Sequence, residues 1–293
     1  MKNCKKTLAM LAALALTAGV LSGCGLRPSF GIGSFVTGES YPNGAAYQTG
    51  AFTYQADDVQ SVEIYWRSGR VELVKSDKAE LSVRESGGEL PEDAAMHYLL
   101  EDGILKIRFC ASNVRLRVHS NDKHLTVEVP RGADLSVHTT SAGVKADTLE
   151  QNSILISAHS GRTELGTVNA ESVWLSSSSG SIRAGSLSAG TLKGNTSSGS
   201  VRIDDLEADS AELETSSGGV DLGLSSVSQL DVHTSSGRTV LRLAEGGGTV
   251  AYIAGSGTLR TERVFEQMGD LYVFGGGESR INVDSSSGNL EIW

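Results

Sequence analysis

ETSSGGVDLG, residues 214–223, decides the fold of this chain, because versions of the phrase recur along the sequence. The related phrases are AHSGRTELG at 158–166, SSSGSIRAG at 177–185, TSSGSVRID at 196–204 and TSSGRTVLR at 234–242. The glycines of the series, from Gly143 to Gly257, are 18, 19, 19, 19, 19 and 20 residues apart. A fixed period of this size predicts a solenoid, in which each repeat is one coil that needs a neighbour to bury its apolar side.

Apolar residues stand at fixed distances from each glycine, on alternate positions. They are Ile154, Val173, Leu192 and Ala211 seven residues before it, Ile156, Leu175, Gly194 and Leu213 five before it, and Leu165, Ala184, Ile203 and Leu222 four after it. Alternation predicts short β-segments with one face inward, so the polar Glu164, Arg183, Arg202 and Asp221 should face solvent. The sequence therefore predicts an all-β, single-stranded parallel β-helix, or β-solenoid, with coils of about 19 residues.

The serine-glycine phrase itself is predicted to be the corner of each coil. Stacking would place Ser160, Ser179, Ser198, Ser217 and Ser236 in a column, with hydroxyls bonded along it or to the turn backbone. We expect the glycine to supply a positive φ. A catalytic nucleophile would occur once rather than in every coil, so these serines are expected to be structural.

Less regular β-sequence flanks the repeats. Residues 57–135 alternate apolar and polar residues with turn signals, and are predicted to start the solenoid and cap its end. Residues 136–293 are predicted to form the solenoid repeats. The corner phrase returns at Gly288, 31 residues after Gly257, so we expect an irregular coil or an inserted hairpin between them.

The chain begins with a basic, then apolar, then small-residue segment, which predicts a signal peptide at 1–23. Leu21-Ser22-Gly23-Cys24 resembles a bacterial lipobox, which makes Cys24 the predicted lipidation site. An ordinary cleavable signal and an uncleaved anchor are the alternatives. Residues 24–56 are predicted to be a tether, with an ordered aromatic segment near Tyr41 to Tyr54 as the alternative for its second half. Only Cys110 then remains, near the core, so no disulfide framework is expected.

With repeat, corner and lipobox in place, the chain resembles a bacterial family of extracytoplasmic β-strand-repeat lipoproteins of unknown function. Its members carry a provisional adhesin label, and some are relatives of Lia-type envelope-stress proteins. The resembling passages are the TSSGxVxL coils at 196–203, 215–222 and 234–241, together with 125–144 and 61–73. The resemblance implies a β-helix-like fold with no established catalytic residue. It carries over no functional residue.

The favoured function is non-catalytic: adhesin-like binding, or an envelope scaffold that presents a solenoid surface to a cell-envelope polymer or a protein partner. We expect no catalytic residue, metal or cofactor, and a location on the outer face of the bacterial cytoplasmic membrane. The formal charge of −10 argues against nucleic acid. Trp174, between two inward residues, is the candidate surface binding residue.

The alternative is a polysaccharide-active enzyme on a pectin-lyase-like β-helix. Its nearest candidate groups are Asp204 and Asp205 with Arg202, and Glu212 with Asp221. Paired carboxylates of this kind must converge on one substrate to act.

Overall fold

The computed structural model describes residues 36–37, 40–116, 123–276 and 278–293, which all lie in one compact unit, Phe35–Trp293. The predicted signal peptide at 1–23 and Cys24 lie outside the described residues. Within the described ranges, no helix combines the length and the apolar character that a membrane crossing requires.

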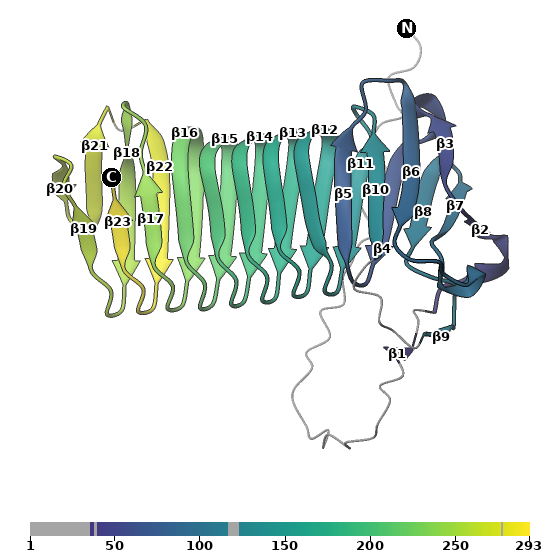
Figure 1. The fold of residues 1–293 in the computed structure, drawn as a ribbon. Helices are drawn as coiled ribbons and strands as arrows, with labels where there is room; N and C mark the ends of the chain where they lie inside the picture. Colours follow the sequence, from purple (N-terminus) through teal and green to yellow (C-terminus); the bar gives the residue numbers. More distant parts are fainter. Residues whose placement is uncertain (1–35, 38–39, 117–122, 277) are drawn as a thin grey trace, which may run out of the picture. The chain divides into compact units, whose positions relative to one another are not determined.

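Long strands form the regular part of the unit (Figure 1). They are β12 (Gly143–Ala158), β13 (Thr163–Ser177), β14 (Ile182–Thr196), β15 (Val201–Thr215) and β16 (Val220–Thr234). Each pairs in parallel with the next at an offset of 19 residues, so that Val173 lies beside Leu192 and Leu192 beside Ala211. The exception is a local shift between β15 and β16, where Leu206 lies beside Leu224. The predicted β-solenoid with 19-residue coils is confirmed.

Each long strand bends twice and so consists of three arms. In β13 the arms are 163–165, 168–170 and 173–177, separated by the exposed pairs Gly166-Thr167 and Glu171-Ser172. Buried and exposed residues alternate within an arm, and two adjacent exposed residues mark each bend. The first and third arms were predictable from the apolar positions around the glycine. The second arm, which buries Val168 and Ala170, was missed.

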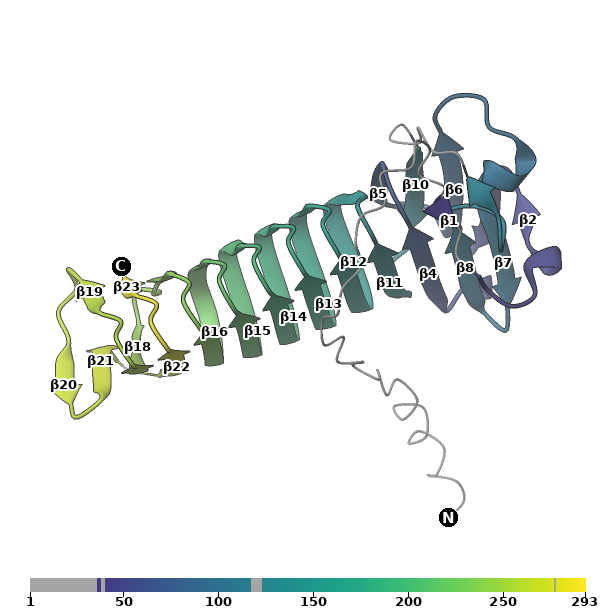
Figure 2. The same cartoon turned by 90° about the horizontal axis from the view of Figure 1, so that it is seen from below.

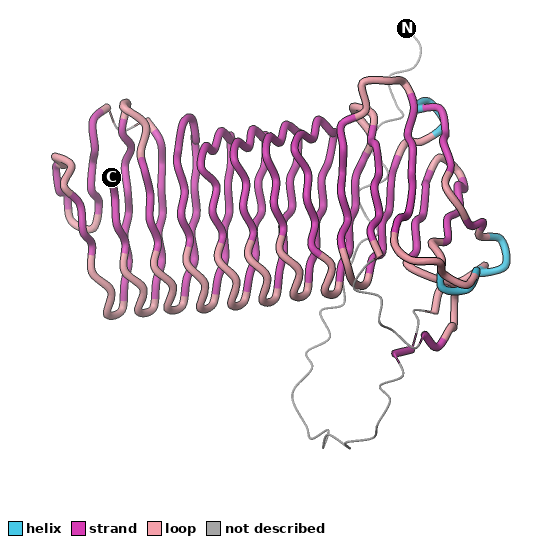
Figure 3. Tube along the Cα trace, viewed as in Figure 1, coloured by secondary structure: helices cyan, strands magenta, loops and turns pink. Residues whose placement is uncertain are grey.

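The corners between the third arm and the next first arm stack on one side of the coils (Figure 3). Their glycines do not have the predicted positive φ: Gly161, Gly180, Gly199, Gly218 and Gly237 all lie outside that region. The prediction is wrong because glycine is required here by close approach. A Cβ at Gly218 would overlap the carbonyl oxygen of Gly199 in the preceding coil, and the same holds along the stack.

The predicted bond from a corner serine to the turn backbone is made by Ser236, whose hydroxyl donates to the carbonyl oxygen of Ser216 at 3.4 Å. A second, inward hydroxyl was not predicted. The serine directly before each glycine is exposed, whereas the residue three positions before it is buried. Thr196, Thr215 and Thr234 each accept a hydrogen bond from the N–H of the corner glycine, at 3.0, 3.0 and 2.9 Å. The corner is therefore closed by this inward threonine.

The first corner also moves by one residue. In the stack, Ala142 rather than Gly143 lies opposite Gly161, because Val144 pairs with Thr163. Gly143 and Gly161 are 18 residues apart, but the equivalent corner positions, Ala142 and Gly161, are 19 residues apart like the others.

In the N-terminal segment, the order of the strands in the sheet differs from their order in the sequence. Its parallel strands are β4 (Ser61–Trp66), β5 (Arg70–Lys75), β8 (Ile104–Arg108), β10 (His124–Val129) and β11 (Asp134–Thr139). β4 lies between β11 and the later β8, and β5 between β12 and the later β10. The first coil in sequence is therefore an inner coil of the stack.

Antiparallel strands complete this less regular cap, as predicted. They are β2 (Gln48–Thr49), β3 (Phe52–Gln55), β6 (Glu80–Ser86) and β7 (His97–Glu101). β1 (Val36–Thr37) pairs with β9 (Arg115–Leu116), and the 3₁₀ helices are η1 (Gly44–Ala46), η2 (Ala56–Asp58) and η3 (Glu92–Ala94). β3 pairs with β6, and Tyr41 is buried. Residues 40–56, assigned to the tether by the sequence, thus belong to the folded unit.

A buried ion pair joins the parts of the cap. Lys123 is almost fully buried, and its Nζ lies 2.7 Å from Glu85 Oε1 and donates to the carbonyl oxygens of Ala94 and Phe109. Burial lowers the pKa of Lys123, and the hydrogen bond that Lys123 donates to Glu85 opposes that shift. The carbonyls and the carboxylate together compensate the charge, as a buried lysine requires.

The C-terminal end is interleaved as well (Figure 2). Its strands are β17 (Thr239–Arg242), β18 (Gly247–Ala254), β19 (Leu259–Thr261), β20 (Glu266–Met268), β21 (Leu271–Gly275), β22 (Ser279–Ser285) and β23 (Leu290–Ile292). β22 lies between β16 and β18, and β23 between β17 and β19. The predicted irregular coil is this returning coil, and β20–β21 is an antiparallel hairpin beside β18.

Candidate binding face

The outward side of the third arms forms a continuous surface, which we call the third-arm face. It comprises the outward residues of β4, of β11, of the third arms of β12–β16, of β22 and of β18. Parallel pairing places equivalent residues of successive coils in one column, in which neighbouring residues are about 4.8 Å apart. Side chains on this face therefore form ladders along the stack.

Planar side chains stack at the N-terminal part of the third-arm face. The guanidinium of Arg108 lies 3.7 Å from the ring centroid of Tyr65. The ring of Tyr65 stacks on His138 at 4.8 Å between centroids, with an angle of 17° between the planes. Ser136 Oγ lies 3.0 Å from His138 Nε2, which fixes the imidazole. These residues come from β8, β4 and β11, which adjoin in the sheet.

Sequence reasoning missed this stack, although a signal was present. Tyr65 and His138 stand at the same distance from their corners, four residues before Gly69 and Ala142. The irregular spacing between 69 and 142 concealed the equivalence.

Trp174 lies on the same face, as its position between Val173 and Leu175 predicted. It is 48% exposed, with Leu155 beside it on one coil and Lys193 on the other. Three coils, or about 14 Å, separate its coil from that of Tyr65. The other two tryptophans are less exposed than Trp174. Trp66 is fully buried, and Trp293 is half-buried with its ring centroid 5.9 Å from the guanidinium of Arg260.

The C-terminal part of the face is acidic and internally bonded. Lys193 pairs with Glu212 at 3.1 Å, and Asn195 donates to Glu214 at 3.2 Å. Asp231 accepts hydrogen bonds from Asn282 at 2.7 Å and Gln229 at 2.8 Å, and these bonds, that of Asn282 above all, lower its pKa. The face thus has an aromatic part, over the N-terminal coils, and a hydrogen-bonded acidic part.

The other two arms carry shallow hollows. Along the first arms, Gly166 and Gly185 form the floor of a groove of about 340 Å³ that Arg183 and Arg202 border. Along the second arms, a groove of about 480 Å³ is bordered by Glu171, Glu207 and Asp209. Neither has the enclosed apolar character typical of a small-molecule site.

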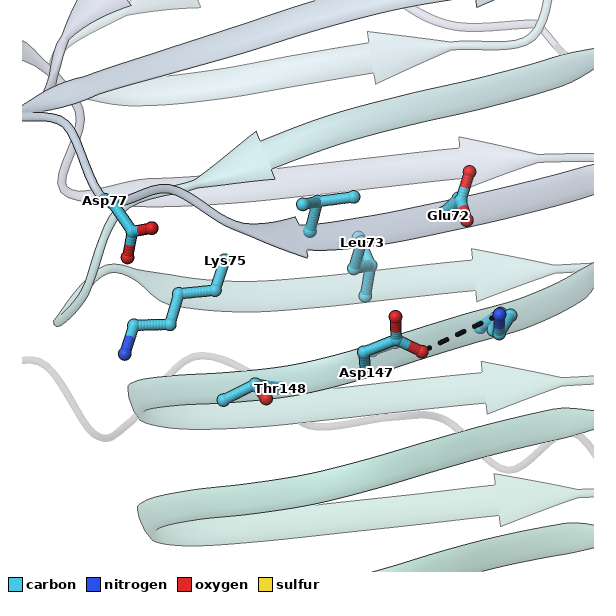
Figure 4. Close-up of a pocket in the computed structure, with 9 residues that line it drawn as sticks. Glu72, Leu73, Lys75, Asp77, Asp147 and Thr148 are labelled. Atoms are coloured by element: carbon cyan, nitrogen blue, oxygen red, sulfur yellow. Dashed lines mark ion pairs between the residues drawn. The ribbon is translucent and has the colours of Figure 1, made fainter.

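A smaller hollow, of about 180 Å³, lies where β5 leaves β12 (Figure 4). Beyond Leu73, β5 pairs with β10 alone, while β12 bends into its second arm. Lys145 and Asp147 form an ion pair of 3.6 Å at its rim, and Lys75 crosses to Glu150 at 3.0 Å. The hydrogen bond from Lys75, aided by Arg131, lowers the pKa of Glu150, so this carboxylate is held ionised and is unsuited to donate a proton.

Of the carboxylates considered for catalysis, Asp204 and Asp221 meet at Arg202, which pairs with both, while Asp205 and Glu212 have other partners. Asp204 is bonded to Arg202 at 2.7 Å, and Arg202 also reaches Asp221 at 3.3 Å. Asp205 accepts hydrogen bonds from Ser186 and Ser225. The Arg202–Asp204 pair lies within β15, whereas the Arg202–Asp221 pair and the bonds of Asp205 join neighbouring coils.

Glu212 and Asp221 lie on different arms, since Glu212 belongs to a third arm and Asp221 to a first arm. They therefore do not form the pair that a glycoside hydrolase needs. In the parts of the chain that the structure covers, no three His, Cys, Asp or Glu side chains are grouped to hold a metal ion.

Cys110 lies two residues beyond β8 and is buried and not in a disulfide. Its carbonyl oxygen accepts a hydrogen bond from the hydroxyl of Tyr41 at 2.8 Å. The residue thus ties the N-terminal segment to the cap.

Similar proteins share this architecture. The sequence profile of the Toastrack DUF4097 family matches residues 59–293. The crystal structure of a candidate adhesin from Parabacteroides distasonis ATCC 8503 is 14% identical, with a TM-score of 0.51, over 84% of this chain and 97% of that one. No curated protein matches this chain.

Two further crystal structures have lower TM-scores. A candidate lipid-binding protein from the same organism is 18% identical with a TM-score of 0.48, over 83% of this chain and 97% of its own. A candidate adhesin from Bacteroides fragilis NCTC 9343 is 10% identical with a TM-score of 0.48, over 84% and 97%. At these identities the likeness concerns the fold alone.

Proposed function

Because this chain belongs to the Toastrack DUF4097 family, we propose that it is a non-catalytic binding module of the bacterial cell envelope. Its fold relative from Parabacteroides distasonis is a candidate adhesin, which agrees with such a role at a coarse level. The ligand we propose is an extended, sugar-containing polymer of the cell wall.

The observation that carries this proposal is the aromatic part of the third-arm face. It presents Trp174 and the stacked Tyr65–His138 pair on one ladder of strands, with Ser157 on the strand between them and Ser176 on the strand of Trp174. Aromatic rings offer large apolar surfaces to the C–H faces of sugar rings. Hydroxyl groups supply hydrogen-bond donors and acceptors. A flat face of this kind suits a polymer rather than a small molecule.

The test is retention of the unit Phe35–Trp293 on purified cell-wall sacculi. Trp174→Ala should weaken binding about tenfold, because the exposed ring supplies most of the contact area. Val74→Ala, which removes an exposed apolar side chain on β5, should bind like the parent. Equal binding of the two variants would contradict the proposal. So would capture of a defined envelope protein without retention on sacculi, which would make the face a protein-binding surface.

The proposed location is the outer face of the cytoplasmic membrane, with a lipid on Cys24. Two acyl chains or more would hold such a protein stably, whereas one holds it weakly. Cys24→Ala should move the protein from the membrane fraction to the soluble fraction. Retention of this variant in the membrane fraction would contradict lipidation at Cys24.

A further inference from the structure

Exposed apolar side chains gather at the C-terminal end of the stack. Seven large apolar side chains are exposed among the described residues, and five of them lie between 253 and 271. These five are Ile253, Val264, Phe265, Met268 and Leu271. Such a concentration on a surface marks a contact site.

Three of the apolar residues at this end form a row across the sheet. Ala251 of β18 lies opposite Leu271 of β21, and Leu271 lies opposite Met268 of β20. Residues directly opposite share a face, so their side chains form one strip. Phe265 lies on the other side, where its ring contacts the buried Phe274 at 5.6 Å and closes the core. The strip is thus free of any role in closing the core.

The strip ends at an open edge. β20 pairs with β21 and with no other strand among the described residues, and all three of its residues are exposed. The outer N–H and C=O groups of such an edge are available to another strand.

We propose that β20 pairs with β20 of a second copy of this chain, in antiparallel fashion about a two-fold axis at Gln267. In this register Gln267 faces its own equivalent, and Glu266 faces Met268 of the second copy. No carboxylate then lies directly opposite another. The two Met268 side chains are diagonal neighbours, as are the two Glu266 side chains, and the contact between the Met268 side chains joins the two apolar strips. The contact is isologous, so it closes as a dimer and does not propagate into a fibre.

Charge favours a second copy at this place. Residues 258–275 contain two arginines and three acidic residues, a net charge of −1, whereas the whole chain carries −10. Two copies repel each other least where both are nearly neutral. A surface of anionic lipid is disfavoured, since no excess of basic residues borders the strip.

The test is sedimentation of the unit Phe35–Trp293 and of matched variants. The parent should sediment with twice the mass of one chain. Met268→Glu should sediment as a monomer, because it faces Glu266 of the other copy. Met268→Lys should remain a dimer, because the lysine then pairs with that glutamate. Val74→Lys, which lies outside the C-terminal end, should also remain a dimer.

A cross-link checks the register independently. Gln267→Cys should give a disulfide-linked dimer under mild oxidation, and Arg260→Cys, an exposed position on β19, should not. A monomeric parent would overturn the proposal, as would a Met268→Glu variant that stays dimeric. Sedimentation of the monomer with phosphatidylglycerol vesicles would also overturn it and assign the strip to lipid. None of these outcomes depends on sacculus binding, so the two proposals fail separately.

Discussion

At the scale of single residues, the corner glycines are fixed by the distance between coils. The carbonyl oxygen of one corner points at the Cα of the next, and this leaves no room for a Cβ. The sequence identified the glycines correctly as corners but gave the wrong reason, because a repeated glycine is equally typical of positive φ and of close approach. Only the stacked geometry distinguishes the two.

Gly218→Ala should therefore be strongly destabilising, by about 3 kcal/mol, because the backbone of a neighbouring coil must shift. The matched control is Gly246→Ala, since nothing lies within 4 Å of a Cβ there and its φ is not positive. Chemical denaturation of both variants measures the difference. Equal stability of the two would contradict the close-approach explanation.

Two buried threonines should respond in opposite ways to replacement by valine. Thr163 is 1% exposed and its hydroxyl has no hydrogen-bond partner, while the equivalent residues of the next coils are Ile182, Val201 and Val220. Thr163→Val should therefore stabilise the fold by about 1 kcal/mol, since it removes an unpaired buried hydroxyl. Thr215→Val should destabilise it by about 1 kcal/mol, because the bond to the Gly218 N–H is lost. Thermal unfolding should move the two midpoints in opposite directions, and a shift of both in one direction would refute the argument.

At the scale of elements, the returning strand β22 is held to β16 by Asp231. Its carboxylate bonds Asn282 across the strands and Gln229 within its own strand. Because these bonds lower the pKa in the folded state, they stabilise the pairing above the ordinary aspartate pKa. That stabilisation is lost as the pH falls through the folded-state pKa.

Asp231→Ala should thus lower stability by about 1 kcal/mol at neutral pH, a value reduced by the partial exposure of the site. The difference from the parent should shrink in acid, where the parent carboxylate is also protonated. Thermal unfolding at both pH values measures this, with Asp209→Ala as a control of equal charge at an exposed position. A difference that persists unchanged in acid would show that the carboxylate charge is not responsible.

The regular elements were predictable and the end elements were not. β13–β15 repeat the same pattern of apolar positions, so one coil predicts the next. β4 instead takes its partners from β8 and β11, far along the chain, and no period links them. The aromatic stack of Tyr65 and His138 depends on that pairing, whereas the exposure of Trp174 needed only the alternation around it.

At the scale of the whole molecule, the predicted β-repeat family is confirmed by the Toastrack DUF4097 match over residues 59–293. In a stack of this kind each coil contacts only its neighbours, so damage at one end should remain local. The chain without residues 278–293 lacks β22 and β23, which separate β16 and β17 from β18 and β19.

In that shortened chain, hydrogen exchange should show that β18–β21 lose protection while β13 and β14 keep it. Protection of β13 in the same sample serves as the internal control. Retained protection in β18–β21 would mean that this end packs without the returning coil.

The interleaved C-terminal coil also sets an order of events in time. Synthesis makes β18 and β19 before β22 and β23, yet the later pair occupies the place between them and the rest of the stack. Before β22 and β23 are made, β18 and β19 must therefore either remain undocked or pair directly with β16 and later be displaced. The last step closes around Trp293, whose N–H bonds the Leu241 carbonyl while its own carbonyl accepts from the Leu243 N–H. If the protein is translocated across a membrane from its N-terminus, the C-terminal coils stay unfolded until Trp293 has crossed. During that time a chaperone or a protease can act on these coils.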